Sequence, residues 1–365
     1  MPIMIKVWVL ALLGLPLAGT ANPAVLPASV GQAREARPHQ AADPSDKLSP
    51  PGSGATVTAP ASAHLNIGMI GLDTSHVIRF AKLLNSPGDP GNIPGVRIAF
   101  AFKGGSPDME LSRSRVDAFE KEIRTTYGVT VLGSIDEVVA RSDAIMIESV
   151  DGRVHLEQAR AVFKGGKPVF IDKPLGGSLR DVLAIAELAR KSNVPIFSSS
   201  GLRFSAGVRK LKEAKLGRLR GAIAYGPAHS EPHHPDLFWY GIHAVEALYT
   251  LMGTGCQTVV RSHTEDTDVV TGTWQNGTTG VVYGLRNGAV AHRIIAFGAK
   301  AIAEENSSGD DTLLREIVAF FRTGKPPVSI EETIELFTFM EAADESKRRG
   351  GQPVTLLDVR NANAR

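Results

Sequence analysis

A regular alternation of short apolar runs and amphipathic segments constrains the fold of this chain more than any other feature, and it begins at Leu65. The apolar runs read as buried strands, and the segments between them have helical spacing of apolar residues. The predicted strands are 65–71, 96–102, 143–147, 168–171 and 195–197, and the predicted helices are 76–84, 112–126, a short helix capped by Ser134, 154–163 and 178–192. This order predicts an α/β fold with a doubly wound parallel sheet.

The pattern changes beyond residue 200. The predicted helices there are 204–214, 242–252, 311–322 and 330–348, and the predicted strands are 219–225, 256–263, 268–274, 278–284 and 290–297. Asn276-Gly277 and Asn287-Gly288 separate the last three strands, and such pairs favour hairpins. We therefore expect a first domain over 64–200 and an α+β second domain over 201–365 with a largely antiparallel, open sheet.

The first 63 residues have a different character. Lys6, the apolar run 7–17 and the small residues 18–21 are typical of a signal peptide, with cleavage after Ala21. The run is short for a membrane span, although an uncleaved anchor or a misassigned start stays open. Residues 22–63 are rich in Pro, Ala, Ser and Gly, which predicts a disordered linker. We expect an exported protein, periplasmic or extracellular, with no other membrane contact.

Composition excludes several classes of partner and site. The 40 basic and 38 acidic residues are well mixed and give a net charge of +2, so the chain lacks the basic face that nucleic-acid binding requires. The single cysteine, Cys256, excludes an intrachain disulfide framework and a cysteine-rich zinc site.

The first strand-to-helix turn, Gly71-Leu72-Asp73-Thr74-Ser75-His76, lies where dinucleotide phosphates bind in such sheets. A Gly-x-Gly-x-x-Gly pattern is expected there, but Asp73 and His76 replace the second and third glycines. Thr74, Ser75 or a protonated His76 can still contact a phosphate. The turn is either a modified cofactor loop or part of a sheet that no longer binds a dinucleotide. In the first case Asp73→Gly should tighten binding, because it removes a negative charge.

Two lysines stand at strand ends. Lys103 follows the second strand, where an acid usually holds the ribose, and it favours the 2′-phosphate of NADP or another anion unless it is simply a surface residue. Lys173, in Asp172-Lys173-Pro174, follows a buried strand at the ligand crevice and can act as a general acid or base.

Several motifs in order resemble the Gfo/Idh/MocA family, which includes glucose–fructose oxidoreductase and inositol dehydrogenase. Asp172-Lys173-Pro174-Leu175 is similar to the family's Glu-Lys-Pro segment, and residues 149–155 stand in place of its loop after strand four. Gly201-Leu202-Arg203-Phe204 resembles its Asn-x-Arg-Phe segment, and 241–246 its Gly-x-His-x-x-Asp helix start. The tail 320–327 is also similar, and the resemblance extends from Leu65 to Leu356.

The resemblance implies a Rossmann-type domain that binds NAD or NADP and a second domain that binds a small sugar-like substrate. It implies that Lys173 and His243 act on a substrate hydroxyl and meet in the cleft between the domains. The cofactor set expected from it is Gly71, Leu72, Asp73, Thr74, Ser75, His76, Lys103, Ser149, Asp151, His155 and Asp172. Arg203, Trp239 and Tyr240 are expected at the substrate, although the two aromatic residues would equally suit a domain interface.

The chain also departs from the family pattern. The acid four residues before the histidine is Trp239 here, and Asp236 replaces it only if the loop bends. The loop 229–236 holds three histidines and two acids, but their spacing fits no helical metal-ligand pair, so a solvated loop is favoured over a metal site.

These features favour an oxidoreductase that transfers hydride between NAD(P) and a sugar or cyclitol hydroxyl. The alternatives are an exported carbohydrate-binding or scaffold protein without the cofactor, an NAD-assisted glycosidase, and a metal-assisted lyase. A homo-oligomer formed through the C-terminal sheet stays open.

Overall fold

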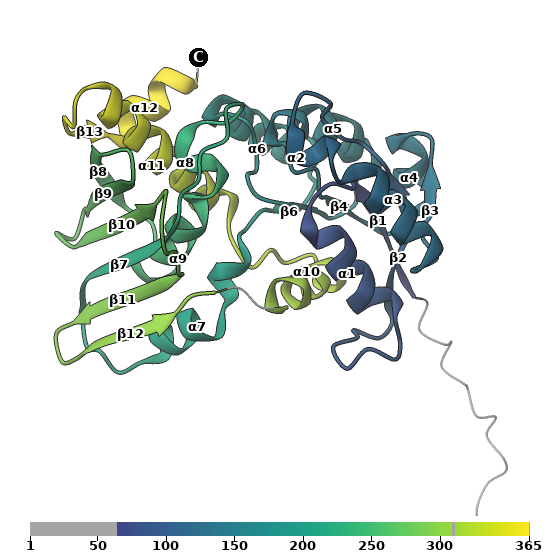
Figure 1. The fold of residues 1–365 in the computed structure, drawn as a ribbon, viewed down its shortest axis with the longest axis horizontal. Helices are drawn as coiled ribbons and strands as arrows, with labels where there is room; N and C mark the ends of the chain where they lie inside the picture. Colours follow the sequence, from purple (N-terminus) through teal and green to yellow (C-terminus); the bar gives the residue numbers. More distant parts are fainter. Residues whose placement is uncertain (1–63, 309–310, 365) are drawn as a thin grey trace, which may run out of the picture. The chain divides into compact units, whose positions relative to one another are not determined.

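The computed structural model describes residues 64–308 and 311–364, which all belong to one structural unit of the chain (Figure 1). The predicted signal peptide, 1–21, and the predicted linker, 22–63, lie outside the described residues. Within the described part, no helix has the length and apolar character needed to cross a membrane.

The first sheet has six parallel strands in the order β3-β2-β1-β4-β5-β6. Their bounds are β1 Leu65–Ile70, β2 Val96–Phe102, β3 Thr130–Leu132, β4 Ala144–Ile147, β5 Val169–Ile171 and β6 Ile196–Phe197. β1 lies at the centre, with Ile67 paired to Ile98 and Met69 paired to Met146. This is the strand order of the Rossmann fold, and the predicted fold class is confirmed.

Helices cover both faces of this sheet, as such strand order requires. They are α1 Ser75–Asn85, α2 Glu110–Arg113, α3 Val116–Thr125, α4 Ile135–Arg141, α5 His155–Val162 and α6 Leu179–Ser192, with the 3₁₀ turns η1 Gly152–Val154 and η2 Phe163–Gly165. Ser134 and Ser178 are the N-caps of α4 and α6, because their side chains accept hydrogen bonds from backbone N–H groups in the first turn. The helix predicted over 112–126 is interrupted at residues 114–115 and forms α2 and α3 instead.

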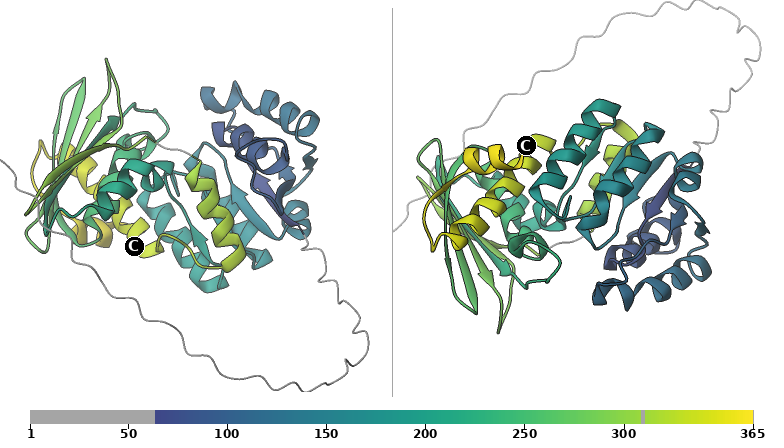
Figure 2. Two further views of the ribbon diagram at one scale, coloured as in Figure 1. Left: turned by 90° about the horizontal axis from the view of Figure 1, so that it is seen from below. Right: turned by 90° about the horizontal axis from the view of Figure 1, so that it is seen from above.

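The second sheet has seven strands in the order β12-β11-β7-β10-β9-β8-β13. Its strands are β7 Leu219–Pro227, β8 Cys256–His263, β9 Thr267–Trp274, β10 Thr279–Leu285, β11 Arg293–Gly298, β12 Ile302–Asn306 and β13 Val354–Thr355. The helical segments of this part are η3 Gly201–Phe204, α7 Ala206–Glu213, α8 Asp236–Trp239, α9 Ile242–Met252, α10 Thr312–Thr323, α11 Ile330–Arg348 and α12 Leu356–Asn363. Figure 2 shows the yellow C-terminal helices on one side of this sheet.

One of the two predicted hairpins is wrong. The Asn276-Gly277 turn does join the antiparallel pair β9 and β10, and Gly277 has φ +78°. β10 and β11, on either side of Asn287-Gly288, are not neighbours, because β7 lies between them. β7 pairs in parallel with β10 and antiparallel with β11, so a strand distant in sequence takes the place that a hairpin partner would fill.

Helix α10 connects the two sheets. It follows β12 in the chain, yet its apolar residues, including Leu314 and Ile317, pack in the core of the first sheet with Val77 and Phe80. Phe320 meets Phe197 of β6 edge to face, with 5.1 Å between the ring centroids. Figure 1 shows α10 beside α1. The core of the first sheet is therefore completed by a helix from the C-terminal part of the chain.

Candidate functional site

Three polar side chains meet at the carboxyl ends of β1, β4 and β5. Glu148 directly follows β4, Asp172 directly follows β5, and His76 lies in the first turn of α1. The Nδ1 atom of His76 lies 3.1 Å from Oδ2 of Asp172 and 3.6 Å from Oε2 of Glu148. Both carboxylates are sealed from solvent, whereas 26% of the His76 side chain is exposed. His76 therefore forms the open side of a buried acidic cluster.

Burial and mutual repulsion determine the charge of this cluster. Burial raises the pKa of Glu148 to about 7, and the neighbouring Asp172 adds to the rise. Burial disfavours the protonated ring of His76, but the two carboxylates outweigh it and raise the pKa of His76 to about 10. Without another cation present, His76 carries a proton at neutral pH.

Lys173 follows β5 of the first sheet, His243 lies in helix α9 against the second sheet, and both approach the same aromatic side chain. The Nζ atom of Lys173 lies 5.4 Å from the ring centroid of Trp239 and 5.7 Å from that of Tyr240. The ring centroid of His243, in the first turn of α9, lies 5.5 Å from that of Tyr240. The structure thus brings the predicted pair together against Tyr240 and places both predicted aromatic residues beside it.

Burial lowers the pKa of both bases. Burial lowers the pKa of Lys173, although Asp172 opposes the change. Burial lowers the pKa of His243 well below its usual value, and the charge of Lys173 lowers it further. The Oγ atom of Ser200 lies 2.7 Å from Nδ1 of His243, which orients the ring and leaves Nε2 for a ligand. Either base can therefore accept a proton from a bound hydroxyl group.

The turn that follows β1 is buried and bonded to neighbouring loops, which the sequence pattern did not reveal. Gly71 has φ +87°, and a Cβ atom there would lie 2.2 Å from Oγ of Ser149, so only glycine fits. Leu72 and Asp73 are fully buried. Asp73 accepts hydrogen bonds from Val150 N at 2.9 Å and from the Ser112 hydroxyl at 2.6 Å. This corrects the expectation that Asp73 adds negative charge where a phosphate would bind.

Thr74 and Ser75 begin helix α1. The Thr74 hydroxyl donates to Oε2 of Glu148 at 3.4 Å, while Ser75 is exposed. Val77 N donates to the Thr74 carbonyl at 3.2 Å. The amides of Ser75 and His76 precede any helical carbonyl that could accept from them, so they are the ones available to an anion.

The side chains of three other predicted cofactor residues are buried in the protein interior. Ser149 accepts a hydrogen bond from the Gln158 side chain at 2.8 Å. Asp151 accepts one from Arg153 N at 2.9 Å and caps η1. His155 is fully buried, with its ring nitrogens 2.8 Å from the Ser149 carbonyl and 2.9 Å from that of Pro174. These side chains shape the loops after β4 and β5 rather than lining the crevice.

Lys103 is neutralised by α3. Its Nζ atom lies 2.6 Å from Oδ1 of Asp117 and 3.1 Å from Oε2 of Glu120. The lysine already has two carboxylate partners, so it no longer favours NADP over NAD. The alternative of a solvated surface lysine describes it better.

Asp236 does not replace the missing acid. Its carboxylate contacts Arg286 and lies 2.6 Å from Arg261 and 2.9 Å from Lys347. Burial acts against its ionised form, yet these cations hold the pKa of Asp236 well below its usual value. A carboxylate held by three cations is a poor base, which corrects the predicted catalytic role.

Arg203 is buried instead of facing a substrate. It lies 2.6 Å from Glu246 and 2.6 Å from Glu332, and Glu246 also accepts a hydrogen bond from Ser200 N at 3.3 Å. The prediction that Arg203 contacts a substrate is therefore wrong. Arg203 orders the segment that carries Ser200, the partner of His243.

The histidine-rich loop is held by hydrogen bonds and borders a polar cavity of about 710 Å³. Oε1 of Glu231 lies 2.7 Å from Nδ1 of His233, and its Oε2 lies 3.0 Å from Nδ1 of His234. Gly152 N donates to Nε2 of His234 at 3.0 Å, so the loop is joined to η1 of the first domain.

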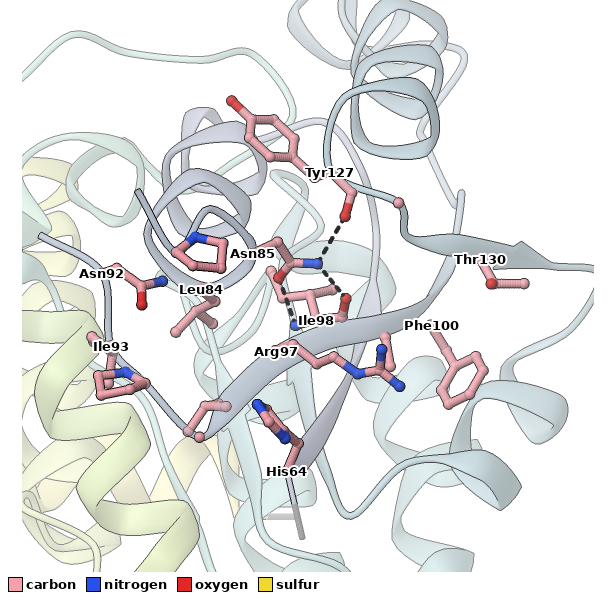
Figure 3. A pocket seen from close by; sticks show the side chains of 16 residues that line it. His64, Leu84, Asn85, Asn92, Ile93, Arg97, Ile98, Phe100, Tyr127 and Thr130 are labelled. Atoms are coloured by element: carbon pink, nitrogen blue, oxygen red, sulfur yellow. Dashed lines mark hydrogen bonds between the residues drawn. The ribbon is translucent and has the colours of Figure 1, made fainter. Parts of the chain in front are cut away.

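A second cavity, of about 490 Å³, lies at the opposite edge of the first sheet (Figure 3). It is lined by residues at the amino-terminal ends of the strands, such as His64 and Arg97. Asn85 closes one side by bonding to Ile98 and to the carbonyl of Tyr127. In parallel sheets ligands bind at the carboxyl ends, so this cavity does not belong to the candidate site.

Sequence reasoning missed Glu148 and Ser200. A signal for Glu148 was present, because it follows a buried apolar run just as Asp172 does after the next strand. Ser200 gave no such signal, since its contact with His243 joins residues 43 positions apart.

Residues 111–199 match the family model GFO_IDH_MocA, described as an oxidoreductase family with an NAD-binding Rossmann fold. Over these residues the chain is similar to the Gfo/Idh/MocA family. The predicted resemblance is thereby confirmed, and of the two cofactors that were expected, NAD or NADP, the matched family model is described with NAD.

Two named relatives are similar to part of this chain. An inositol 2-dehydrogenase of Cereibacter sphaeroides is 35% identical over 115 residues, which are 30% of this chain and 33% of that protein. A 1,5-anhydro-D-fructose reductase of Ensifer adhaerens is 28% identical over 130 residues, which are 34% of this chain and 38% of that protein. The match thus spans little more than a third of either relative.

Solved structures share the fold over a longer range. A probable dehydrogenase from Thermotoga maritima has a TM-score of 0.65 at 23% identity, covering 81% of this chain and 100% of that one. A scyllo-inositol dehydrogenase from Lactobacillus casei, solved with NAD(H) and scyllo-inositol, has a TM-score of 0.66 at 15% identity, covering 80% of this chain and 99% of that one. At these identities the likeness establishes the fold.

A dinucleotide fits the first turn of the Rossmann-type sheet through its backbone. Gly71 makes the tight turn, and the Asp73 carboxylate is directed away from the phosphate position. The Gly71 amide donates to the Phe102 carbonyl at 3.0 Å, so Ser75 and the first amides of α1 are the groups that would hold the pyrophosphate. The bound dinucleotide would supply the hydride acceptor.

Proposed function

We propose that this protein is an NAD-dependent oxidoreductase that acts on a hydroxyl group of a cyclitol or sugar. The observation that carries the proposal is that Lys173, after β5 of the first sheet, and His243, in helix α9 against the second sheet, both lie against Tyr240. Both bases have lowered pKa values through burial, so the hydroxyl proton has an acceptor while NAD takes the hydride. The named relatives that act on inositol or anhydrofructose support this substrate class.

The partly buried Tyr240 supports a ring-shaped substrate, with Trp239, which packs on Met109 and Val150, behind it. Lys173 lies near both aromatic faces, and such faces pack well against the C–H surface of a sugar or cyclitol. A substrate ring on this wall would bring one hydroxyl group to Lys173 and His243. The two bases are held differently. Ser200 orients the His243 ring, and Asp172 precedes Lys173 in the chain and accepts a hydrogen bond from its backbone N.

The test is NADH formation by the purified chain with a panel of inositols and sugars. We expect turnover with at least one of them, and we expect Lys173→Met and His243→Ala each to lower turnover by roughly 10²–10⁴-fold. Lys191→Met is the matched control, because Lys191 lies on the exposed face of α6 and pairs only with Glu187. Full turnover in either active-site variant would refute the assignment of the bases. Binding of NADH without turnover on any cyclitol or sugar would refute the substrate class.

A further inference from the structure

We infer that His76, Glu148 and Asp172 bind a divalent transition-metal ion, with Zn²⁺ and Mn²⁺ as the ions to test. One ligand atom from each residue lies within 4.8 Å of the others. Two carboxylates and a neutral imidazole match a dication in charge. Imidazole nitrogen combined with carboxylate oxygen is a common ligand set for such ions.

The separations between the ligand atoms agree with a shared ion. Two atoms that each lie about 2.1 Å from one tetrahedral ion are about 3.4 Å apart. Nδ1 of His76 lies 3.1 Å from the Asp172 oxygen and 3.6 Å from the Glu148 oxygen, on either side of that value. The ligand atoms could therefore bind an ion with only small adjustments.

One proposed ligand atom lacks a partner that an ion would provide: Nδ1 of His76 is buried and has no hydrogen-bond partner among the described residues. Oε1 of Glu148 is unpartnered in the same way, although the oxygen that lies 3.6 Å from Nδ1 is Oε2, so an ion would pair Oε1 only by binding both oxygens of Glu148. Glu148 is fully buried, and an unpaired oxygen on a sealed carboxylate is costly. A protonated His76 satisfies neither atom fully, because Nδ1 is not aligned for a hydrogen bond with either acid.

The remaining groups of the three ligands are held in place. Oδ1 of Asp172 accepts a hydrogen bond from Lys173 N at 2.8 Å, which leaves Oδ2 for the ion. Thr74 donates to Glu148, and the His76 ring stacks on Phe80 with 4.7 Å between centroids. Metal ligands in proteins are commonly fixed by such outer contacts.

The proposed ion would be open to the crevice. The two acids are sealed below it, while His76 is partly exposed and Lys173 is half-buried. Three protein ligands leave a coordination position for water or for a substrate hydroxyl. This metal site goes beyond the proposed oxidoreductase, whose proton acceptors are Lys173 and His243.

The test uses the full chain, treated with EDTA, dialysed and titrated calorimetrically with Zn²⁺ and with Mn²⁺. We expect one ion per chain for at least one of the two metals. Glu148→Gln and His76→Gln should each weaken binding by more than about 100-fold, since loss of an outer contact alone costs about 10–100-fold. Glu231→Gln is the matched control, because it alters the other His/Glu cluster and should leave binding unchanged.

Three results would overturn the proposal: no binding by the wild-type chain, full binding by the Gln variants, or loss of binding in Glu231→Gln. The Tm of each variant in EDTA shows whether it is folded, and Asp172→Asn replaces any variant that is not. Visible absorption of the Co²⁺-loaded chain provides a second readout, which should change in His76→Gln. NADH titration of the same samples tests the proposed function separately, so either proposal can fail alone.

Discussion

Asp151 shows how one buried carboxylate fixes the loop after β4. It accepts hydrogen bonds from the backbone and the guanidinium of Arg153, and it is almost completely buried. Burial alone would raise the pKa of Asp151, but Arg153 and Ser106 outweigh it and lower the value to about 2. The ionised form is therefore the form that the folded loop stabilises.

Asp151→Asn should destabilise the protein near neutral pH by about 2 kcal/mol. A lowered pKa contributes stability above the unfolded value, 3.8, and this contribution is lost as the pH falls through about 2. The difference between variant and wild type should therefore be constant near neutral pH and shrink below about pH 4. Urea denaturation at several pH values measures it. Asp117→Asn, an exposed site, should show little effect at any pH, and a pH-independent loss in Asp151→Asn would contradict the argument.

At the scale of elements, the turn between β1 and α1 depends on Asp73. Its two hydrogen bonds join this turn to the loop after β4 and to α2. Asp73→Gly leaves Val150 N and the Ser112 hydroxyl without their acceptor, so we expect a loss of stability of about 1–3 kcal/mol. We also expect weaker NADH binding, the opposite of what the sequence pattern alone predicts. Thermal unfolding and NADH titration measure the two effects.

Asp73→Asn is the control for this prediction. An asparagine oxygen can still accept from Val150 N, so this variant should keep most of the stability and most of the NADH affinity. Tighter NADH binding in Asp73→Gly would show that the carboxylate repels the dinucleotide after all.

The elements that sequence reasoning predicted well are those whose hydrophobic pattern and caps act locally. The helix predicted over 242–252 coincides with α9, and the strand predicted over 96–102 coincides with β2. The short edge strands β3 and β13 were missed, because so few residues carry little periodicity. The position of β7 was missed for another reason. Its pairing with β10 and β11 is set by contacts between distant segments.

At the scale of the whole molecule, site residues that stand in a local motif were predicted correctly, and those whose role depends on distant segments were not. Lys173 and His243 were predictable, because each stands in a motif at the end or start of an element. Asp236 and Arg203 were assigned to the site wrongly, since their partners, such as Lys347 and Glu332, come from α11 far along the chain. One sequence does not reveal those ion pairs.

We also propose that the chain is exported, on the basis of its first 21 residues. Expression of the full chain in a Gram-negative host should yield periplasmic protein that begins at Asn22, because Lys6 and the following apolar run are typical of a signal peptide. Mass spectrometry of the purified protein measures the start. Leu12→Arg interrupts the apolar run and should keep the protein in the cytoplasm. A cytoplasmic wild-type protein with residues 1–21 intact would refute export.

The position of Lys173 over Trp239 has an optical consequence. The chain has three tryptophans, Trp8, Trp239 and Trp274, and export would remove the first. Trp274 is buried in the C-terminal core, where its indole donates to the Gly253 carbonyl at 2.9 Å. Of the two tryptophans in the described residues, Trp239 is the one beside the proposed bases, 5.4 Å from the Lys173 nitrogen, whose protonation influences indole emission. The candidate site thus contains its own fluorophore, and the intrinsic fluorescence of the unmodified protein reports on what enters the crevice.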